Sequence, residues 1–218
     1  MSLSANISLP ADEQHNYVSA VFVHLLQPIA DLCDRMLALD CSEPNEVQAS
    51  PAENGYAISI IALTAFLLEG ACGRTRYISG EKQCPPVDTL LDLGNNDLAS
   101  RVEEIFVVRD VIAHAHLWKA KISWDLQFRE LPVLLQGYGD RKFERLVDPD
   151  SRRTRQLQLD IFPNRIHRTT AIVALKETAK VLAFLESKER NFVYLQHRDV
   201  RIRDKFMRFY NWVGDLPA

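Results

Sequence analysis

The sequence predicts a mainly helical protein, an up-and-down bundle of four or five helices with a small β-hairpin insertion around residues 122–165. Two observations predict this class. Apolar residues recur at three- and four-residue steps in four separate stretches, which is typical of helices that bury one face. Alternation of apolar and polar residues, which is typical of half-buried strands, marks the inserted region.

The first predicted helix runs from about Gln14 to Leu39. Pro28 lies inside this stretch and is expected to kink the helix, because proline removes one backbone hydrogen bond. Residues 41–53 follow, and their content of Ser, Pro, Asn and Glu predicts a loop.

The second predicted helix spans Ala57 to Cys72 and is apolar nearly all round. A helix without a polar face is expected at the centre of a bundle. Gly70 and Gly73 are expected to end it, because glycine is common at helix C-termini. The following residues 79–86 contain Gly and two Pro residues and are predicted to form a turn.

The third predicted helix begins at about Asn96 or Asp97, where Asp97 can act as its N-cap, and runs to Trp118. The fourth runs from about Arg168 to Glu189, with charged residues opposite an apolar stripe. Residues 192–218 form a basic C-terminal extension. Its cations alternate with carboxylates, so a solvated, salt-bridged face is favoured over an RNA groove.

The insertion between the third and fourth helices is predicted to contain two strands. Residues 122–128 and 156–162 both alternate apolar and polar side chains. The segment that joins them is rich in turn-forming residues and is expected to be exposed. These two strands are therefore predicted to pair as the hairpin.

Length and composition favour one domain over residues 1–218. A cytoplasmic location is expected because the sequence shows no signal-peptide pattern. The net charge of −3 provides no overall attraction for nucleic acid, so an RNA contact needs a local basic patch. The sequence predicts no signal peptide and no membrane span. It also predicts no cofactor and no metal site. The cysteines are expected to be reduced thiols and mostly packing residues; they are Cys33, Cys41, Cys72 and Cys84.

A polar cluster interrupts the third predicted helix. Arg109, Asp110 and His114 lie among Val, Ile and Ala residues. Asp110 and His114 are four positions apart, so the carboxylate can accept a hydrogen bond from the imidazole. Arg109 and His114 are about 140° apart around a helix, so both can act together only in a groove beside a second helix or a second chain. There the arginine could bind a phosphate while the histidine moves a proton.

The third predicted helix has an Arg followed directly by a polar residue, and a His follows after three more positions. This pattern, late in a helix of a bundle, is similar to the motif of the HEPN family. Arg109, Asp110 and His114 match it, and the helix order resembles the family over about residues 14–190. The resemblance implies a homodimer formed through the motif-bearing helices and a metal-independent endoribonuclease. His114 would transfer a proton, Arg109 would stabilise the charged transition state, and Asp110 would orient one of them. A toxin or phage-defence role, with an antitoxin or nucleotidyltransferase partner, is implied in the same way.

Structural alternatives exist for each of these residues. Arg109 can form a buried ion pair with Glu69, the lone acid of the second helix, or Glu69 can position Arg109 for a functional role. His114 and His116 can be core histidines, and His116 is also a rival for the catalytic role. A His114–His116 metal site is disfavoured, because side chains two apart on a helix diverge. The alternative function is a non-catalytic helical interaction or nucleotide-binding module.

Overall fold

The computed structural model describes residues 20–41, 49–114, 118–122, 128–134, 141–189 and 195–217. Most of these residues are helical, which confirms the mainly helical class. The helices are η1 (Val21–Leu25), α1 (Leu26–Leu37), α2 (Pro51–Ile78), α3 (Pro86–Asp92), α4 (Asn96–Ala113), α5 (Arg141–Leu146), η2 (Pro163–Arg165), α6 (Arg168–Lys188) and α7 (Phe209–Asp215). The strands are β1 (Trp118–Ile122), β2 (Phe128–Leu134), β3 (Asp199–Ile202) and β4 (Lys205–Arg208).

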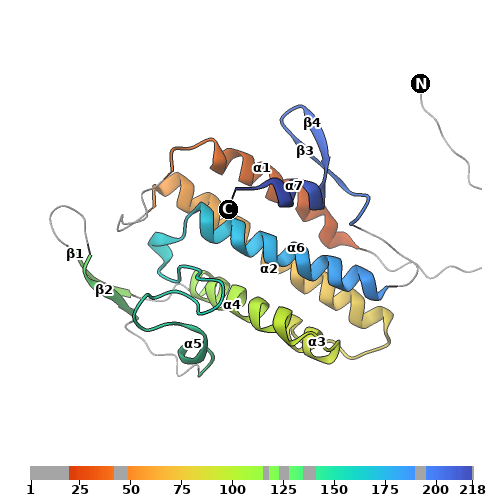
Figure 1. The fold of residues 1–218 in the computed structure, drawn as a ribbon, viewed down its shortest axis with the longest axis horizontal. Helices are drawn as coiled ribbons and strands as arrows, with labels where there is room; N and C mark the ends of the chain where they lie inside the picture. The colour runs from red at the N-terminus through yellow and green to blue at the C-terminus, as the bar shows by residue number, and fades with distance from the viewer. Residues whose placement is uncertain are drawn as a thin grey trace, which may run out of the picture.

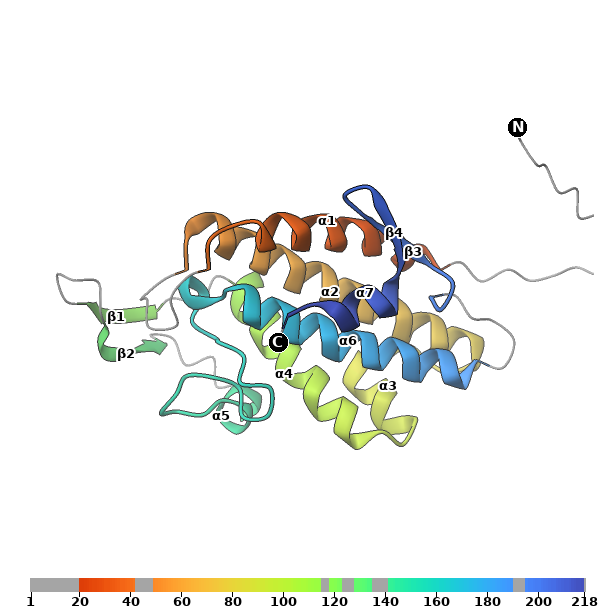
Figure 2. The same ribbon diagram turned by 45° about the horizontal axis from the view of Figure 1, so that its top comes forward.

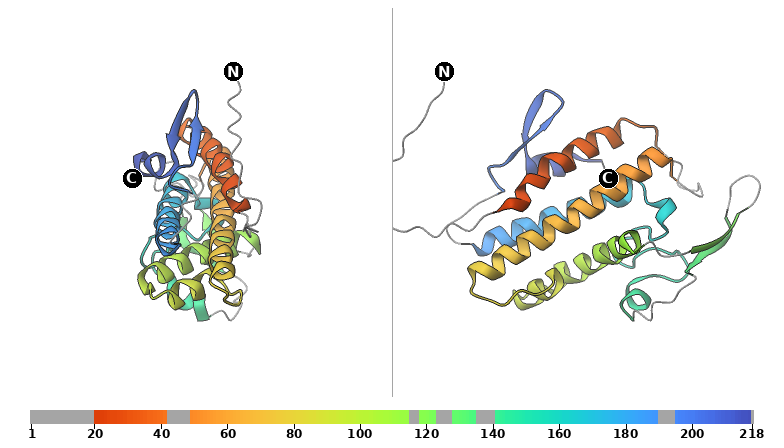
Figure 3. Two further views of the ribbon diagram at one scale, coloured as in Figure 1. Left: turned by 90° about the vertical axis from the view of Figure 1, so that its right-hand side faces the viewer. Right: turned by 180° about the vertical axis from the view of Figure 1, so that it is seen from behind.

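Helix α2 lies at the centre of the molecule and packs against α1, α4 and α6 (Figure 1). Along the chain, α1, α2, α4 and α6 run alternately in opposite directions, as Figures 1 and 3 show. The short helix α3 leads into α4. The β1–β2 hairpin and α5 lie at the end of the bundle where α4 ends and α6 begins (Figure 2).

The core forms where these helices meet. Its fully buried side chains are mainly aliphatic and include Ile29, Met36, Ile60, Leu67, Ile105, Leu175 and Leu182. Each such side chain stabilises the fold by about 1.5–3 kcal/mol relative to an exposed one.

By length and composition alone, α2 could also cross a membrane, although the sequence predicts no such segment. Half of its apolar window is buried in the bundle, as in a core helix.

Helix α2 is longer than predicted at both ends. Its N-terminus falls inside the expected loop, because Ser50 caps it by accepting a hydrogen bond from the Glu53 amide at 3.3 Å. At the other end, neither Gly70 nor Gly73 terminates the helix, which runs to Ile78. A Cβ atom at position 70 would lie 2.6 Å from Cβ of Phe22, so the glycine permits close packing of η1 against α2. Gly80 adopts a positive φ of 71° in the turn predicted after the helix.

The first helix is shorter than predicted and begins with a different geometry. The chain forms the 3₁₀ helix η1 and changes to α-helix at Leu26. Pro28 lies in the first turn of α1, where a missing N–H breaks no helical hydrogen bond, so the predicted kink is replaced by a helix start. The helix ends at Leu37, and residues 14–19 of the prediction lie outside the described residues.

The third predicted helix starts at Asn96, as expected, but Asp97 lies in its first turn and is not the N-cap, and the helix ends early. The Asn95 side chain, one residue before the predicted start, accepts a hydrogen bond from the Leu98 amide at 3.1 Å. Helix α4 ends at Ala113, and Trp118 belongs to strand β1. The additional helix α3 was not predicted. It begins at a proline and is followed by Gly94 with φ of 77°, both of which are ordinary helix-boundary signals.

The insertion contains a hairpin, but not the predicted one. Strand β1 ends at Ile122, where the first predicted strand was expected to begin, and residues 123–127 lie outside the described residues. Strand β1 pairs antiparallel with β2, so residues 128–134 take the place that was predicted for 156–162. The amides of Gln156 and Leu157 donate to the buried carboxylate of Glu104, each at 2.8 Å, instead of to a strand. Gln158 has a positive φ of 55°, which no strand residue adopts.

The C-terminal part agrees with the prediction for α6 and adds detail after it. Helix α6 ends one residue earlier than predicted. The basic extension contains a two-stranded hairpin, β3–β4, followed by α7.

All four cysteines are free thiols. Burial raises the pKa of Cys33 and of Cys72 to about 12, so both are uncharged packing residues at neutral pH, as predicted.

Candidate functional site

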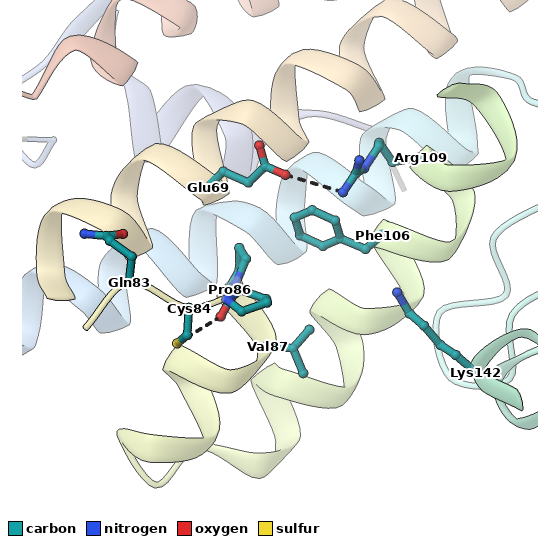
Figure 4. A pocket seen from close by; sticks show the side chains of 9 residues that line it. Glu69, Gln83, Cys84, Pro86, Val87, Phe106, Arg109 and Lys142 are labelled. Atoms are coloured by element: carbon teal, nitrogen blue, oxygen red, sulfur yellow. Dashed lines mark hydrogen bonds and ion pairs between the residues drawn. The ribbon is translucent and has the colours of Figure 1, made fainter. Parts of the chain in front are cut away.

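Arg109 lies near the C-terminal end of α4 and reaches towards α2 (Figure 4). Its Nη2 atom lies 3.4 Å from Oε1 of Glu69 on α2. Its Cζ atom lies 4.8 Å from the centre of the Phe106 ring, a cation–π contact that stabilises a surface site by about 0.5–1 kcal/mol. The Arg109 side chain is 28% exposed and that of Glu69 is 42% exposed. The two residues therefore form a half-exposed bridge between helices, not a buried ion pair.

Asp110 lies between two cations. Its Oδ1 atom lies 3.3 Å from Nε of Arg109, and its Oδ2 atom lies 3.6 Å from Nζ of Lys142 on α5. All three side chains are about one third exposed, so water and small anions can reach them. Sequence reasoning missed Lys142, because it lies in a segment that was predicted to be a turn and reaches α4 only through tertiary packing.

His114 lies just after α4, as the C-cap residue. Its backbone N–H donates to the Asp110 carbonyl at 3.0 Å, and the residue is exposed. A core position for His114, one of the alternatives, is therefore excluded by the structure. His114 is thus the residue that ends the helix, and its backbone bond to Asp110 keeps the two residues one helical turn apart. His116 lies outside the described residues.

A pocket of about 430 Å³ opens beside Arg109 and Lys142 (Figure 4). This volume falls in the range of small-molecule sites. One wall is apolar and consists of Pro85, Pro86, Val87 and Phe106. The remaining lining side chains are polar or charged and consist of Glu69, Gln83, Cys84, Arg109 and Lys142. The pocket therefore combines an apolar surface with two cations and one carboxylate, Glu69, which pairs with Arg109.

The α2–α3 connection supplies the pocket wall opposite α4, and sequence reasoning did not identify it. Cys84 is held there by contacts of its Sγ atom with the Arg76 guanidinium and, at 3.3 Å, with Oγ1 of Thr89. Gln83 donates to the Gly73 carbonyl at 2.9 Å. Contacts with the end of α2 and the start of α3, five to ten residues away in the sequence, thus fix the position of this loop.

The structure brings together Glu69, Arg109 and Asp110 from the sequence analysis, and His114 lies at the end of the same helix. In the described part of the chain, no cluster of three or more His, Cys, Asp or Glu side chains could hold a metal ion. Comparison with known proteins finds no match among protein-family models, curated proteins or solved structures.

Proposed function

We propose that this protein is a HEPN-like, metal-independent endoribonuclease. One observation carries the proposal: Arg109, Asp110 and Lys142 form a half-exposed charged cluster at the C-terminal end of α4, beside an open pocket, and the exposed His114 follows on the same helix end. Two accessible cations can bind a phosphodiester, and a histidine can move a proton near neutral pH. The matching of Arg109, Asp110 and His114 to the HEPN motif supports the same function.

The reaction class that fits these groups is attack of a ribose 2′-hydroxyl on the adjacent phosphorus. The new bond joins O2′ to phosphorus, and the bond from phosphorus to the 5′-oxygen breaks. His114 takes part in the proton transfer, either from the 2′-hydroxyl or to the leaving oxygen. Arg109, with Lys142, stabilises the additional negative charge on the phosphoryl oxygens in the transition state. Asp110 holds these two cations in place through its ion pairs with both.

Arg109→Ala is the first test of this function. Purified protein is incubated with single-stranded RNA or tRNA in the presence of EDTA, and initial cleavage rates are compared. Loss of one transition-state donor is expected to lower the rate by about 10²–10³-fold. Arg109→Lys should retain part of the activity, because it keeps the charge but not the planar donor geometry. Tyr77→Ala, an exposed aromatic outside the site, serves as the matched control. Cleavage that survives Arg109→Ala, or that disappears in EDTA, contradicts the mechanism.

We further propose that the protein acts as a homodimer through the motif-bearing helix α4, with the second copy also covering the neighbouring exposed face of α2. Phe66 lies one turn before Glu69 on α2 and is 54% exposed, so this face has an apolar side chain next to the site. Phe66→Glu is expected to convert the dimer to a monomer, measured by analytical ultracentrifugation. An unchanged sedimentation profile, or a wild-type protein that is monomeric at all concentrations, argues against this interface.

The second candidate function is a non-catalytic interaction or nucleotide-binding module. The contacts of Arg109 with Glu69, Asp110 and Phe106 favour it, because they occupy the guanidinium with structural partners. Thermal unfolding separates the two candidates. Half-exposed ion pairs contribute about 0–1 kcal/mol, so Arg109→Ala in an RNase should change the melting temperature only slightly. A fall of many degrees without any RNA cleavage by the wild type supports the structural role.

The biological setting is also a proposal and follows from the resemblance to HEPN proteins. A cytoplasmic toxin or phage-defence ribonuclease would require a means of restraint. An antitoxin or a nucleotidyltransferase is the kind of partner that the family resemblance implies. Co-purification of the protein with the product of a neighbouring gene would test this setting.

A further inference from the structure

The β3–β4 hairpin is held firmly on the bundle by its backbone. The side-chain amide of Gln27 on α1 donates to the Arg201 carbonyl and accepts from the Arg201 N–H, each at 2.8 Å. Val200 is fully buried, and the Phe209 amide donates to the Arg198 carbonyl at 2.9 Å at the base of the hairpin. The position of the hairpin therefore does not depend on its charged side chains.

One face of this hairpin presents an arginine and an aromatic ring to solvent. In the antiparallel register, Val200 pairs with Met207, and Arg201 pairs with Phe206. Because side chains alternate between the faces of a strand, the first pair faces the bundle and the second faces solvent. Phe206 is 72% exposed, the highest value among the large hydrophobic side chains in the described part of the chain.

The hairpin has the exposed salt bridges that the sequence predicts for the basic extension, but they leave a surplus of positive charge in a chain whose net charge is −3. Residues 198–208 contain five cations against two carboxylates, an excess of three positive charges. The cations are Arg198, Arg201, Arg203, Lys205 and Arg208. Arg208 pairs with Asp199, its neighbour across the hairpin, at 3.1 Å. Arg201 pairs with Asp204 at 3.6 Å and Arg203 with Asp34 of α1 at 3.2 Å. Both arginines are mostly exposed, so these pairs contribute little and a phosphate can replace either carboxylate.

We infer that the solvent-facing side of the β3–β4 hairpin is a binding surface for single-stranded nucleic acid. An exposed aromatic ring flanked by cations is the arrangement that binds single strands, because every base can stack on the ring while the cations contact the phosphates. A membrane surface fits less well. Asp204, at the turn of the hairpin, is 98% exposed and would be driven into an anionic headgroup layer or the hydrocarbon beneath it.

This surface is separate from the candidate site. The hairpin lies along α1, whereas Arg109 and Lys142 lie at α4 and α5, on the opposite edge of the bundle (Figures 1 and 3). If the proposed RNase function is correct, the hairpin would hold a remote part of the RNA strand. Base stacking and phosphate binding involve no 2′-hydroxyl, so the surface should bind single-stranded DNA as well as RNA.

Fluorescence anisotropy with labelled oligodeoxythymidylate and oligouridylate tests the inference. The DNA probe has no 2′-hydroxyl and cannot undergo the proposed cleavage, so binding is measured independently of it. Phe206→Ala is expected to raise the Kd by roughly tenfold through loss of base stacking, and Phe206→Trp should restore binding. The double change Arg201→Gln and Arg203→Gln should reduce the salt dependence, by about 0.7 in the log–log slope for each phosphate that the protein no longer neutralises.

Two exposed residues outside the hairpin provide matched controls. Tyr77→Ala removes another exposed aromatic, and Lys82→Gln removes another exposed cation; both are expected to bind like the wild type. Wild-type affinity in the Phe206→Ala and double-arginine variants overturns the inference, as does an equal loss in the two controls. Binding to phosphatidylserine vesicles but not to either oligonucleotide also overturns it. A protein that binds the DNA probe through the hairpin but cleaves no RNA overturns the proposed function alone.

Discussion

Replacing His114 by alanine is expected to slow RNA cleavage by about 10²–10⁴-fold, the usual contribution of a positioned general acid or base. The imidazole lies at the exposed end of α4, and the backbone hydrogen bond from His114 to Asp110 does not depend on the side chain. The helix end should therefore persist in the variant. Initial rates on single-stranded RNA in EDTA measure the effect.

His24→Ala is the matched control, because His24 is also exposed but lies in η1. It should cleave at the wild-type rate. Far-ultraviolet circular dichroism and the melting temperature of His114→Ala should match those of the wild type. If His114→Ala cleaves RNA as fast as the wild type does, His114 has no part in the reaction.

The largest loss of stability is expected for Glu53→Ala, at about 3–5 kcal/mol in the free energy of unfolding. Glu53 is fully buried near the start of α2 and accepts hydrogen bonds from the backbone N–H and from Nε of Arg168, at 3.1 and 2.8 Å. The side-chain bond raises the pKa of Arg168 above its usual range, so the guanidinium stays charged. Removing the carboxylate leaves a nearly buried cation without its counter-ion.

Urea-induced unfolding measures this loss, and two other variants separate its causes. Glu53→Gln keeps an acceptor oxygen but removes the charge, so it should fall between Glu53→Ala and the wild type. Glu81→Ala removes the exposed partner of Arg76 at 3.9 Å and should cost less than about 1 kcal/mol. If Glu53→Ala is no less stable than Glu81→Ala, the Glu53–Arg168 pair does not hold α2 and α6 together.

Hydrophobic periodicity located the four main helices, because each buries an apolar stripe whose spacing is visible in the sequence. Helix ends were less predictable. Gly70 resembles a C-terminal signal but is required by the close approach of Phe22. Residues 156–162 alternate like a strand, yet Glu104 binds two of their amides and removes the donors that a strand would use. Both outcomes depend on residues that are distant in the sequence.

The candidate site was also only partly predictable from the sequence. Arg109, Asp110 and His114 stood out because polar side chains interrupt an apolar helix, and Glu69 stood out as a lone acid. Lys142 gave no such signal, since a lysine in a turn-rich segment is unremarkable until packing brings it 3.6 Å from Asp110. The pocket wall formed by the α2–α3 connection was hidden for the same reason.

The most direct measurement is cleavage of a defined RNA oligonucleotide by the wild-type protein in EDTA, with and without a single 2′-deoxy substitution at the scissile nucleotide. Proton transfer by His114 and charge stabilisation by Arg109 predict cleavage that persists in EDTA, leaves a 2′,3′-cyclic phosphate and a 5′-hydroxyl, and stops at the deoxy position. Cleavage that requires a divalent metal ion, or that continues at the deoxy position, would contradict the assignment of Arg109, Asp110 and His114 to a metal-independent ribonuclease site.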